Sequence, residues 1–214
     1  YRLGLDRLVA LLHALRSDGA SALRCLDVGG GLAVPYDASE DTPADVASFA
    51  ATVASATADL GVEVIVEPGR FLVADAGILV ARVLFRKHSG GREIVIVDAG
   101  MNDLLRPSHY NAFHRVEAVA PHDGERESVD LVGPICETGD FIALDRTLEV
   151  LAPGDLVAVH TAGAYGFAMA SQYNSRPRAP EVLVDDGRWA VIRDRETYDD
   201  LVRHETAHPD WRMP

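Results

Sequence analysis

The sequence predicts an α/β fold followed by an all-β fold: parallel β/α units, as in part of a barrel, then a mostly antiparallel β domain. Two apolar runs, at residues 23–28 and 62–66, each end in a glycine-containing turn, and a helical pattern precedes each run. Such alternation is typical of parallel β/α units. From residue 78 onward, short apolar runs are separated by turn residues, which indicates an all-β domain. We therefore expect β/α units of a barrel at residues 1–77 and a β domain at residues 78–214.

The first domain is expected to contain two amphipathic helices. The first covers residues 3–17, and its apolar face consists of leucines at helical spacing: Leu5, Leu8, Leu12 and Leu15. The second is expected to begin with Thr42 as its N-cap and Pro43 at the first helical position, with Asp45 completing a start similar to a capping box. Gly61 is expected to end it directly before the second strand.

The β domain is expected to consist of short strands joined by turns. The predicted strands are Ile78–Phe85, Ile94–Val97, Phe113–Val119, Ser128–Val132, Asp155–His160, Glu181–Val184 and Trp189–Ile192. The dipeptide Asp186-Gly187 is a strong signal for a hairpin between the last two strands. Residues 195–201 are expected to form a short helix.

Composition narrows the classes of function. The net charge of −13 argues against nucleic-acid binding, which needs a basic face, and no stretch approaches the ~20 apolar residues that span a bilayer. Two cysteines make no disulfide framework, so a reducing cytoplasm is the simple inference. No signal peptide is apparent, and because tyrosine is not a natural first residue we expect further residues before Tyr1.

Two glycine-containing turns predict a site for an anion. Gly29, Gly30 and Gly31 follow the first strand, and Glu67-Pro68-Gly69-Arg70 follows the second. Consecutive glycines allow backbone N–H groups to turn toward one point, and such nests bind anions, phosphate above all. Either stretch alone is equally consistent with a plain turn. Because both fall at the carboxyl ends of consecutive strands, where ligands of β/α folds bind, we favour a phosphate site with Arg70 beside it.

Three polar clusters are expected in loops of the β domain. The first, residues 101–110, contains Arg106 and Tyr110, which together can hold a carboxylate; an ordinary surface loop is the alternative. The second, residues 133–140, presents Cys136 beside Glu137, and a thiol there can act as an acid or base. In the third, residues 163–174, Tyr165 lies between glycines, where it can approach a flat ligand or be a core tyrosine.

Metal binding has little support in the sequence. His204 and His208 have helical spacing with Asp210 near, but we interpret this segment as a solvated tail. Cys25 is interpreted as an inert core residue. We therefore expect no metal site.

The motifs in order, GGG, EPGR, MNDLLRPSHY, GPICETGD and GAYGFAMASQYN, resemble the carboxy-terminal portion of diaminopimelate decarboxylases. These are pyridoxal-phosphate enzymes of the alanine-racemase-like fold, which joins a β/α barrel to a β domain. The resemblance covers residues 1 to about 201. It implies that residues 1–77 are the last β/α units of a TIM-like barrel, the carboxy-terminal part of the cofactor-binding domain. It implies decarboxylation of meso-diaminopimelate to L-lysine, the last step of lysine biosynthesis, with pyridoxal 5'-phosphate as cofactor.

The resemblance also assigns roles to the motif residues. It implies that the cofactor is bound by Gly29, Gly30, Gly31, Glu67, Pro68, Gly69, Arg70 and Tyr165. It implies that Arg70, Arg106 and Tyr110 hold the substrate's carboxylate end, that Glu137 contacts its distal amine, and that Tyr165 also touches the substrate. Cys136 matches the proton donor. In the family Cys136 and Glu137 reach into the partner subunit's site, which implies a homodimer with composite active sites.

This sequence departs from the family in lacking two residues that bind the cofactor. The family has a lysine that holds the cofactor covalently and a histidine that stacks on its ring, and both belong to a part upstream of this sequence. Lys87 is the single lysine here, and its predicted place on a hairpin of the β domain excludes that role.

Two alternatives stay open. The first is a related decarboxylase of ornithine, arginine or carboxynorspermidine. Diamine-forming relatives have aspartate directly after the cysteine, whereas Glu137 follows Cys136 here. The second is a non-catalytic fragment or pseudoenzyme, which the missing lysine would allow.

Overall fold

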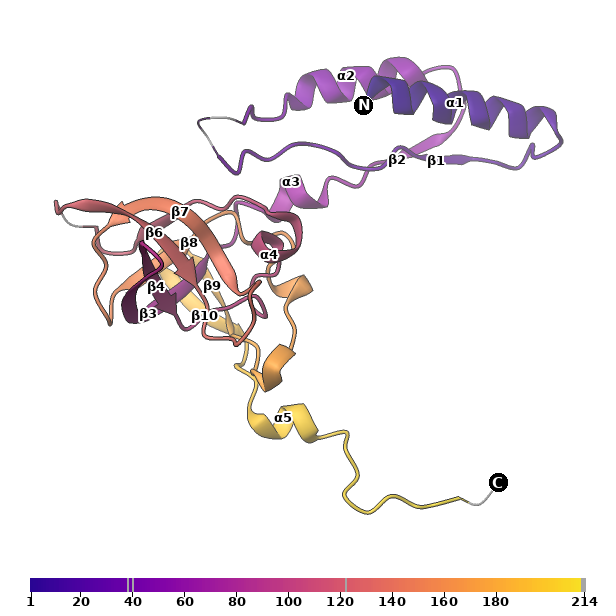
Figure 1. Cartoon of the computed structure of the whole chain (residues 1–214). Helices are drawn as coiled ribbons and strands as arrows, with labels where there is room; N and C mark the ends of the chain where they lie inside the picture. Colours follow the sequence, from indigo (N-terminus) through magenta and orange to yellow (C-terminus); the bar gives the residue numbers. More distant parts are fainter. Residues whose placement is uncertain (38, 40, 122, 213–214) are drawn as a thin grey trace. The chain divides into compact units, whose positions relative to one another are not determined.

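The computed structural model describes residues 1–37, 39, 41–121 and 123–212. The chain forms two compact units. One comprises Tyr1–Ile78 together with His160–Ala164, and the other comprises Leu79–Val159 and the chain from Tyr165 onward (Figure 1). The segment 160–164 thus belongs with the first unit, although in the sequence it lies between the two stretches of the second.

The first unit is built from two helix–strand pairs, as the sequence predicts. Its elements are α1 (Arg2–Ser17), β1 (Cys25–Asp27), α2 (Val46–Thr57), β2 (Glu63–Ile65) and α3 (Gly69–Val73). Strands β1 and β2 are parallel, with Leu26 paired to Val64. Leu12 of α1 packs against Leu26 and Leu60 in a small core, which removes their apolar surface from water.

The N-cap predicted for the second helix is wrong. Helix α2 begins at Val46, and its N-cap is Asp45, whose carboxylate accepts a hydrogen bond from the Ser48 amide at 2.9 Å. An aspartate cap satisfies one of the amides that a first helical turn leaves without a partner, so the N-cap lies three residues after the predicted Thr42.

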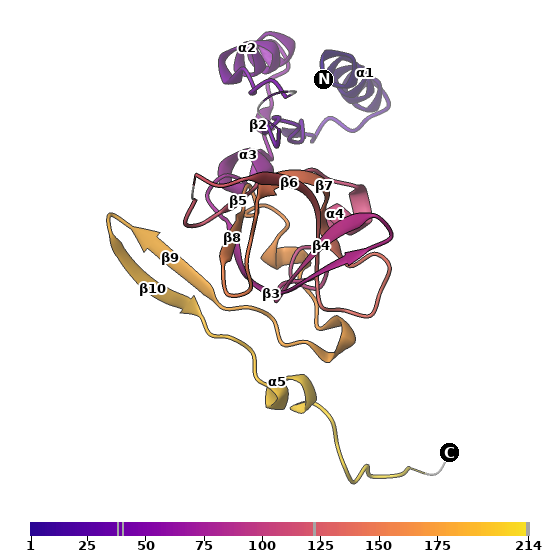
Figure 2. The ribbon, with the colours of Figure 1, turned by 60° about the vertical axis from the view of Figure 1, so that its left-hand side comes forward.

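The second unit is organised around one six-stranded sheet. Its strands are β3 (Leu79–Ser89), β4 (Arg92–Val97), β5 (Val116–Ala118), β6 (Arg126–Val132), β7 (Phe141–Glu149) and β8 (Leu156–Val159). Their order is β5-β8-β3-β4-β6-β7, and all neighbours are antiparallel except β4 and β6. The sheet curls around a common interior until its edge strands β5 and β7 approach each other (Figure 2). The α/β unit followed by a mostly antiparallel sheet confirms the predicted fold class.

The interior of the curled sheet is apolar. Val83, Val95, Leu131 and Val157, from four different strands, are each 1% exposed or less. Strand β7 is absent from the sequence-based prediction. Asp145, in its middle, has φ 52°, and the pairing of β6 with β7 shifts register, so the alternation of apolar and polar residues that reveals a strand is interrupted.

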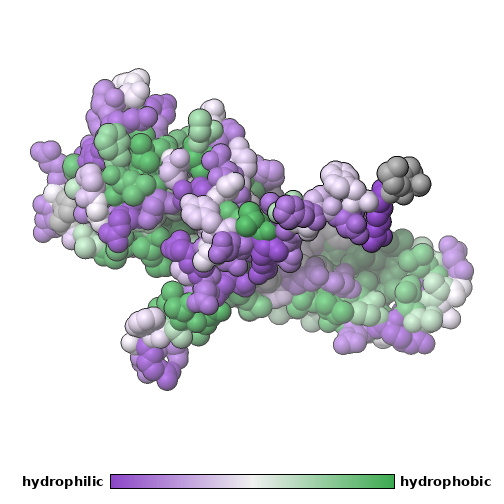
Figure 3. All heavy atoms as spheres, turned by 90° about the horizontal axis from the view of Figure 1, so that it is seen from below, coloured by the Kyte–Doolittle hydropathy of each residue, from purple (hydrophilic) through white to green (hydrophobic). Residues whose placement is uncertain are grey.

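The last two strands form a separate hairpin. Strand β9 (Glu181–Asp185) pairs with β10 (Arg188–Arg193), and Asp186 and Gly187 both have positive φ, as a two-residue hairpin turn requires. The hairpin exposes apolar residues, including Val184 and Trp189. Figure 3 shows hydrophobic surface interspersed with hydrophilic surface on this face of the molecule. Helix α5 (Tyr198–Val202) follows, and Thr197 and Asp200 form its capping box.

Candidate functional site

The two glycine-containing turns of the first unit lie side by side. Because β1 and β2 are parallel neighbours, the turns that follow them begin at the same edge of the pair. The amide of Glu67 donates to the carbonyl oxygen of Gly29 at 2.9 Å, which joins the two turns directly. The amide of Gly29 itself donates to the carboxylate of Asp27 at 2.8 Å. The sequence-based expectation that these motifs come together is met by this geometry.

The middle glycine admits no side chain. A Cβ atom on Gly30 would lie 2.2 Å from the carbonyl oxygen of Glu67, and Gly29 and Gly31 have φ of 71° and 91°. A residue with a side chain would therefore either collide with the second turn or be strained. At the triplet, the backbone of the first turn therefore lies in close contact with the backbone of the second turn.

The Glu67–Arg70 turn continues into α3, with Pro68 as its N-cap, and Arg70 is exposed.

The third predicted cluster, residues 163–174, begins at Gly163, which contacts the end of α3. The amide of Gly163 donates to the carbonyl oxygen of Ala74 at 3.0 Å, and a Cβ on Gly163 would lie 2.0 Å from the carbonyl oxygen of Val73. Gly163 is thus glycine because the end of α3 leaves no room for a side chain.

In the second unit, Asp140 joins the first and second polar clusters. It is 3% exposed, and its two carboxylate oxygens accept hydrogen bonds from the amides of Met101 at 2.7 Å and Ile135 at 2.6 Å. Its own carbonyl oxygen accepts from the amide of Gly133 at 3.0 Å. Sequence reasoning quoted Asp140 within the second motif but gave it no role. It fixes the loop that carries Cys136.

Cys136 and Glu137 lie on the exposed side of that loop. The phenol of Tyr173, from the third cluster, donates to Glu137 Oε2 at 3.2 Å. This hydrogen bond, and then the negative charge of Glu137, raise the pKa of Tyr173 above its ordinary value. The structure therefore brings a thiol, a carboxylate and a phenol together on one surface.

The first cluster is not the loop that the sequence suggests. Residues 106–110 form α4 (Arg106–Tyr110), with Pro107 in its first turn, where no amide donor is needed. Arg106 is 7% exposed and lies 6.0 Å from the centre of the Tyr165 ring, so the structure brings these two predicted residues together. Tyr110 is 61% exposed and packs its ring edge-on against His109. Tyr110 therefore lies on the surface, whereas Arg106 is buried.

Tyr165 is held in a rare backbone conformation. Its φ is 64°, and its side chain is 41% exposed. A left-handed backbone at a residue other than glycine costs free energy, and such residues are enriched at functional sites. This geometry favours the ligand-contacting interpretation of Tyr165 over that of a core tyrosine.

Arg176 is a residue that the sequence analysis did not single out. Its guanidinium donates to Asn102 Oδ1 at 3.1 Å and to the carbonyl oxygen of Asp98 at 2.5 Å. Asn102 is 1% exposed, and beside it burial raises the pKa of Asp103. Nothing local in the sequence marks Arg176, because its partners are more than 70 residues away.

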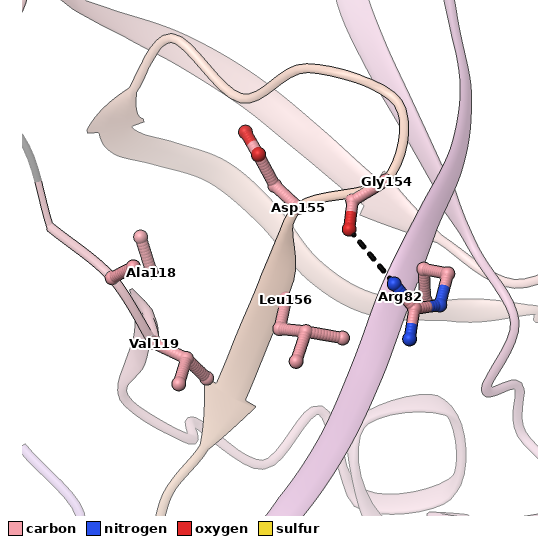
Figure 4. Close-up of a pocket in the computed structure, with 7 residues that line it drawn as sticks. Arg82, Ala118, Val119, Gly154, Asp155 and Leu156 are labelled. Atoms are coloured by element: carbon pink, nitrogen blue, oxygen red, sulfur yellow. Dashed lines mark hydrogen bonds between the residues drawn. The ribbon is translucent and has the colours of Figure 1, made fainter.

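In the other described parts of the chain we find no comparable group of polar and titratable side chains. The pocket in Figure 4, of about 260 Å³, is lined by Arg82, Gly154, Asp155 and Leu156 among others, none of them a predicted site residue. Within the described ranges no three His, Cys, Asp or Glu residues are grouped to hold a metal ion, and no helix is long and apolar enough to span a membrane. Lys87 is exposed on β3, opposite Ile94 in the β3–β4 hairpin.

Known proteins match nearly the whole chain. A family described as pyridoxal-dependent decarboxylase, C-terminal sheet domain, matches residues 24–163. The diaminopimelate decarboxylase of Aquifex aeolicus is 46% identical over 204 residues, which are 94% of this chain and 48% of that protein. The enzyme of that name from Vibrio cholerae is 45% identical over 96% of this chain and 48% of its own length.

Solved structures agree with these matches. A crystal structure of a protein from Aquifex aeolicus, 44% identical, has a TM-score of 0.90 and covers 97% of this chain and 51% of that one. Diaminopimelate decarboxylase from Helicobacter pylori in complex with L-lysine, 40% identical, has a TM-score of 0.84 over 94% of this chain and 50% of that one. The chain spans about half the length of the curated relatives it matches, and it belongs to the pyridoxal-dependent decarboxylase family, whose C-terminal sheet domain it carries.

Proposed function

We propose that the whole protein decarboxylates meso-diaminopimelate to L-lysine with pyridoxal 5'-phosphate as cofactor. One observation carries the proposal: relatives named diaminopimelate decarboxylase match 94% and 96% of the chain at 46% and 45% identity. The first unit is then the end of the β/α barrel, with the domain boundary near residue 77, and the second is the β domain.

The residues present fit the phosphate end of the cofactor. Gly29, Gly30 and Gly31 pack against the Glu67–Arg70 turn so closely that Gly30 admits no Cβ, which leaves backbone amides rather than side chains at this edge. Backbone amides of this kind and an arginine are the groups that bind phosphate. When bound, pyridoxal phosphate stabilises the negative charge that remains on the substrate carbon after CO₂ leaves.

The chain's own residues supply binding and proton transfer in this proposal. Arg70, Arg106 and Tyr110 hold a carboxylate, because guanidinium groups and a phenol present several donors to its oxygens. Glu137 binds the distal ammonium group by opposite charge. The thiol of Cys136 gives its proton to the substrate carbon after CO₂ has left. Tyr165 contacts cofactor and substrate.

The covalent attachment of the cofactor is proposed to lie outside these 214 residues. Lys87 is the single lysine of the sequence, and its exposed position on β3 favours an ordinary solvated lysine. The resemblance supports a cytoplasmic homodimer in which Cys136 and Glu137 serve the partner subunit's site.

The test uses the complete protein with added pyridoxal phosphate. Release of CO₂ and formation of L-lysine from meso-diaminopimelate are expected, with much lower kcat/KM for ornithine, arginine and carboxynorspermidine. Preference for one of these would assign the protein to the related decarboxylases. Absence of turnover on all four, with the cofactor bound, would favour a pseudoenzyme.

A variant tests the phosphate loops separately. Gly30→Ala should greatly weaken cofactor binding, because the added Cβ would force the two turns apart. Gly4→Ala in α1 is the matched control, since its Cβ meets no atom within 4 Å. Equal cofactor affinity of both variants would remove the triplet from the cofactor site.

A further inference from the structure

Tyr173, which donates to Glu137, lies on a turn with a strained backbone. Asn174 and Ser175, the two residues that follow it, have φ of 60° and 55°. Both therefore adopt the left-handed conformation, which costs free energy in residues other than glycine. Such residues persist where the surrounding structure holds them in place. The contacts at the two ends of this turn, residues 171–176, therefore decide where the phenol of Tyr173 lies.

One residue, Asn102, binds both ends of the turn. Its carbonyl oxygen accepts from the amide of Ser171 at 2.8 Å, and its Oδ1 accepts from Nε of Arg176 at 3.1 Å. Because Asn102 is almost fully buried, water competes little for these two hydrogen bonds. The turn is thus closed by a single side chain and its own backbone.

The guanidinium of Arg176 is held in two directions. Besides Nε, its Nη2 donates to the carbonyl oxygen of Asp98 at 2.5 Å. Asp98 and Asn102 both lie in the chain that follows β4, a strand whose Val95 and Val97 are fully buried. Since the donors of a guanidinium lie in one plane with fixed directions, two acceptors on such a base fix the orientation of the side chain.

The loop that carries Glu137 is attached to the neighbouring residue. The amide of Met101 donates to the carboxylate of Asp140, and the same carboxylate accepts from an amide of the Glu137 loop. The two partners of the hydrogen bond between Tyr173 and Glu137 are therefore held by consecutive residues, Met101 and Asn102. Loss of either attachment would separate the phenol from the carboxylate.

We propose that Arg176 is a positioning residue: its contact with Asn102 closes the turn 171–176 and sets the phenol of Tyr173 on Glu137. Glu137 is thereby oriented for the substrate's distal ammonium group. The inference rests on the proposed function, in which Glu137 binds that group. Arg176 itself is not expected to touch the substrate.

The first test needs no substrate. The tyrosines of the complete protein are labelled with ¹³C at Cζ and titrated by NMR, and the signal of Tyr173 is identified by its loss in Tyr173→Phe. In the parent protein the bond to Glu137 raises the pKa of Tyr173 above its ordinary value of 10. In Arg176→Met, which keeps an apolar stem and loses every donor, this pKa should fall toward 10 because the phenol leaves Glu137.

Two further variants complete the titration. Arg188→Met is the matched control, since Arg188 on β10 is 78% exposed at its side chain and should leave the pKa of Tyr173 unchanged. Arg176→Lys is the milder change at position 176 and keeps the positive charge. Its ammonium group lacks the planar fork, so the pKa should fall here too, by less. No fall in any folded variant at position 176, or an equal fall in Arg188→Met, overturns the proposal.

Kinetics of the complete enzyme test the link to the substrate. Arg176→Met should raise KM for meso-diaminopimelate by roughly two- to fivefold, the size expected for an exposed charged contact, and kcat should change less. Combined with Tyr173→Phe, it should raise KM no further than the larger single change, because both substitutions remove the same hydrogen bond. Independent, multiplying increases in KM would show that Arg176 acts by another route, and would overturn the proposal.

The two tests separate this inference from the proposed function. If the parent protein does not decarboxylate meso-diaminopimelate, the proposed function is wrong, and the titration still decides whether Arg176 positions Tyr173. If the enzyme is active and the pKa of Tyr173 falls in Arg176→Met while KM is unchanged, the orientation of Glu137 for the substrate is refuted.

Discussion

The phenol of Tyr173 donates a hydrogen bond to Glu137 at 3.2 Å, across 36 positions of the sequence. The bond joins the loop that carries Cys136 to the short 3-10 helix Tyr173–Ser175. Because the bond raises the pKa of Tyr173, the phenol remains a donor throughout the neutral range. Tyr173 therefore orients the carboxylate proposed to bind the substrate's distal ammonium group.

Replacing this phenol tests its part in the site. Tyr173→Phe in the complete enzyme should raise KM for diaminopimelate by roughly two- to fivefold, because exposed charged contacts contribute little, and kcat should change less. Steady-state kinetics measure both constants. Tyr198→Phe is the control, since Tyr198 is 73% exposed on α5. If the two variants have the same KM, Tyr173 does not orient Glu137 for binding.

Asp140 is expected to matter for both stability and activity. Asp140→Asn keeps one carbonyl oxygen but turns an NH₂ group toward a buried amide, so the loss of a hydrogen bond to a charged acceptor should cost about 2–3 kcal/mol. Urea unfolding of the complete protein measures this cost, and kcat should fall because the Cys136 loop loses its attachment.

Asp155→Asn provides the comparison for Asp140, because its carboxylate accepts from one amide, that of Ala152 at 2.7 Å, at the edge of the unit. The cost there should be about 1 kcal/mol or less. Equal losses of stability in the two variants would contradict the conclusion that Asp140 stabilises the unit by joining two loops.

The sequence predicts those parts of this molecule that depend on neighbours in the chain. The parallel pair β1–β2, the turns after it and the hairpin at Asp186-Gly187 follow from apolar runs and glycines close to one another. The loop that carries Cys136 is likewise visible as a run of turn residues.

Features that depend on contacts between residues far apart in the sequence cannot be predicted from local patterns. Strand β7 is interrupted by the left-handed Asp145, whose amide donates to the carboxylate of Asp130 on the partner strand β6. The contacts of Asp140 and Arg176 join residues that no local spacing connects, although Asp140 lies within a quoted motif. The role of a polar residue can be assigned only when its burial and its hydrogen-bond partner are known.

Glu196 predicts a pH dependence of stability. Hydrogen bonds from Arg178, first from its side chain, lower the pKa of Glu196 from 4.5 to about 2. A lowered folded-state pKa contributes stability that is fully present above pH 4.5 and is lost as the pH falls toward 2. Because the pair is partly exposed, Glu196→Gln should cost only about 1 kcal/mol at pH 7, or ~2–4 °C in Tm.

Calorimetry at several pH values checks this dependence. The difference in Tm between the parent protein and Glu196→Gln should shrink from pH 4.5 downward. Asp185→Asn is the control, because the exposed pair of Asp185 with Arg188, 68% and 78% exposed at their side chains, should contribute almost nothing. A difference for Glu196→Gln that persists unchanged below pH 2.5 would contradict the pKa assignment.

The last prediction concerns the proton donor. If Cys136 protonates the substrate carbon, Cys136→Ala in the complete enzyme should lower kcat by ~10²–10⁴-fold while cofactor binding is retained. Cys136→Ser should recover little of this, because a hydroxyl is a far weaker acid than a thiol. Cys25→Ala is the control, since Cys25 is exposed on β1, not in the core as expected from the sequence, and has no proposed role in the reaction.

The proposed composite site allows a sharper test of the same residue. A subunit with Cys136→Ala is mixed with one whose cofactor-binding lysine, upstream of this chain, is replaced. Each parent is expected to be nearly inactive. In a mixed dimer, one of the two sites would combine the intact lysine of one subunit with the intact cysteine of the other, so part of the activity should return. If heterodimers form and the mixture stays as inactive as its parents, then Cys136 does not act across the subunit interface, and it must serve the site of its own chain or none.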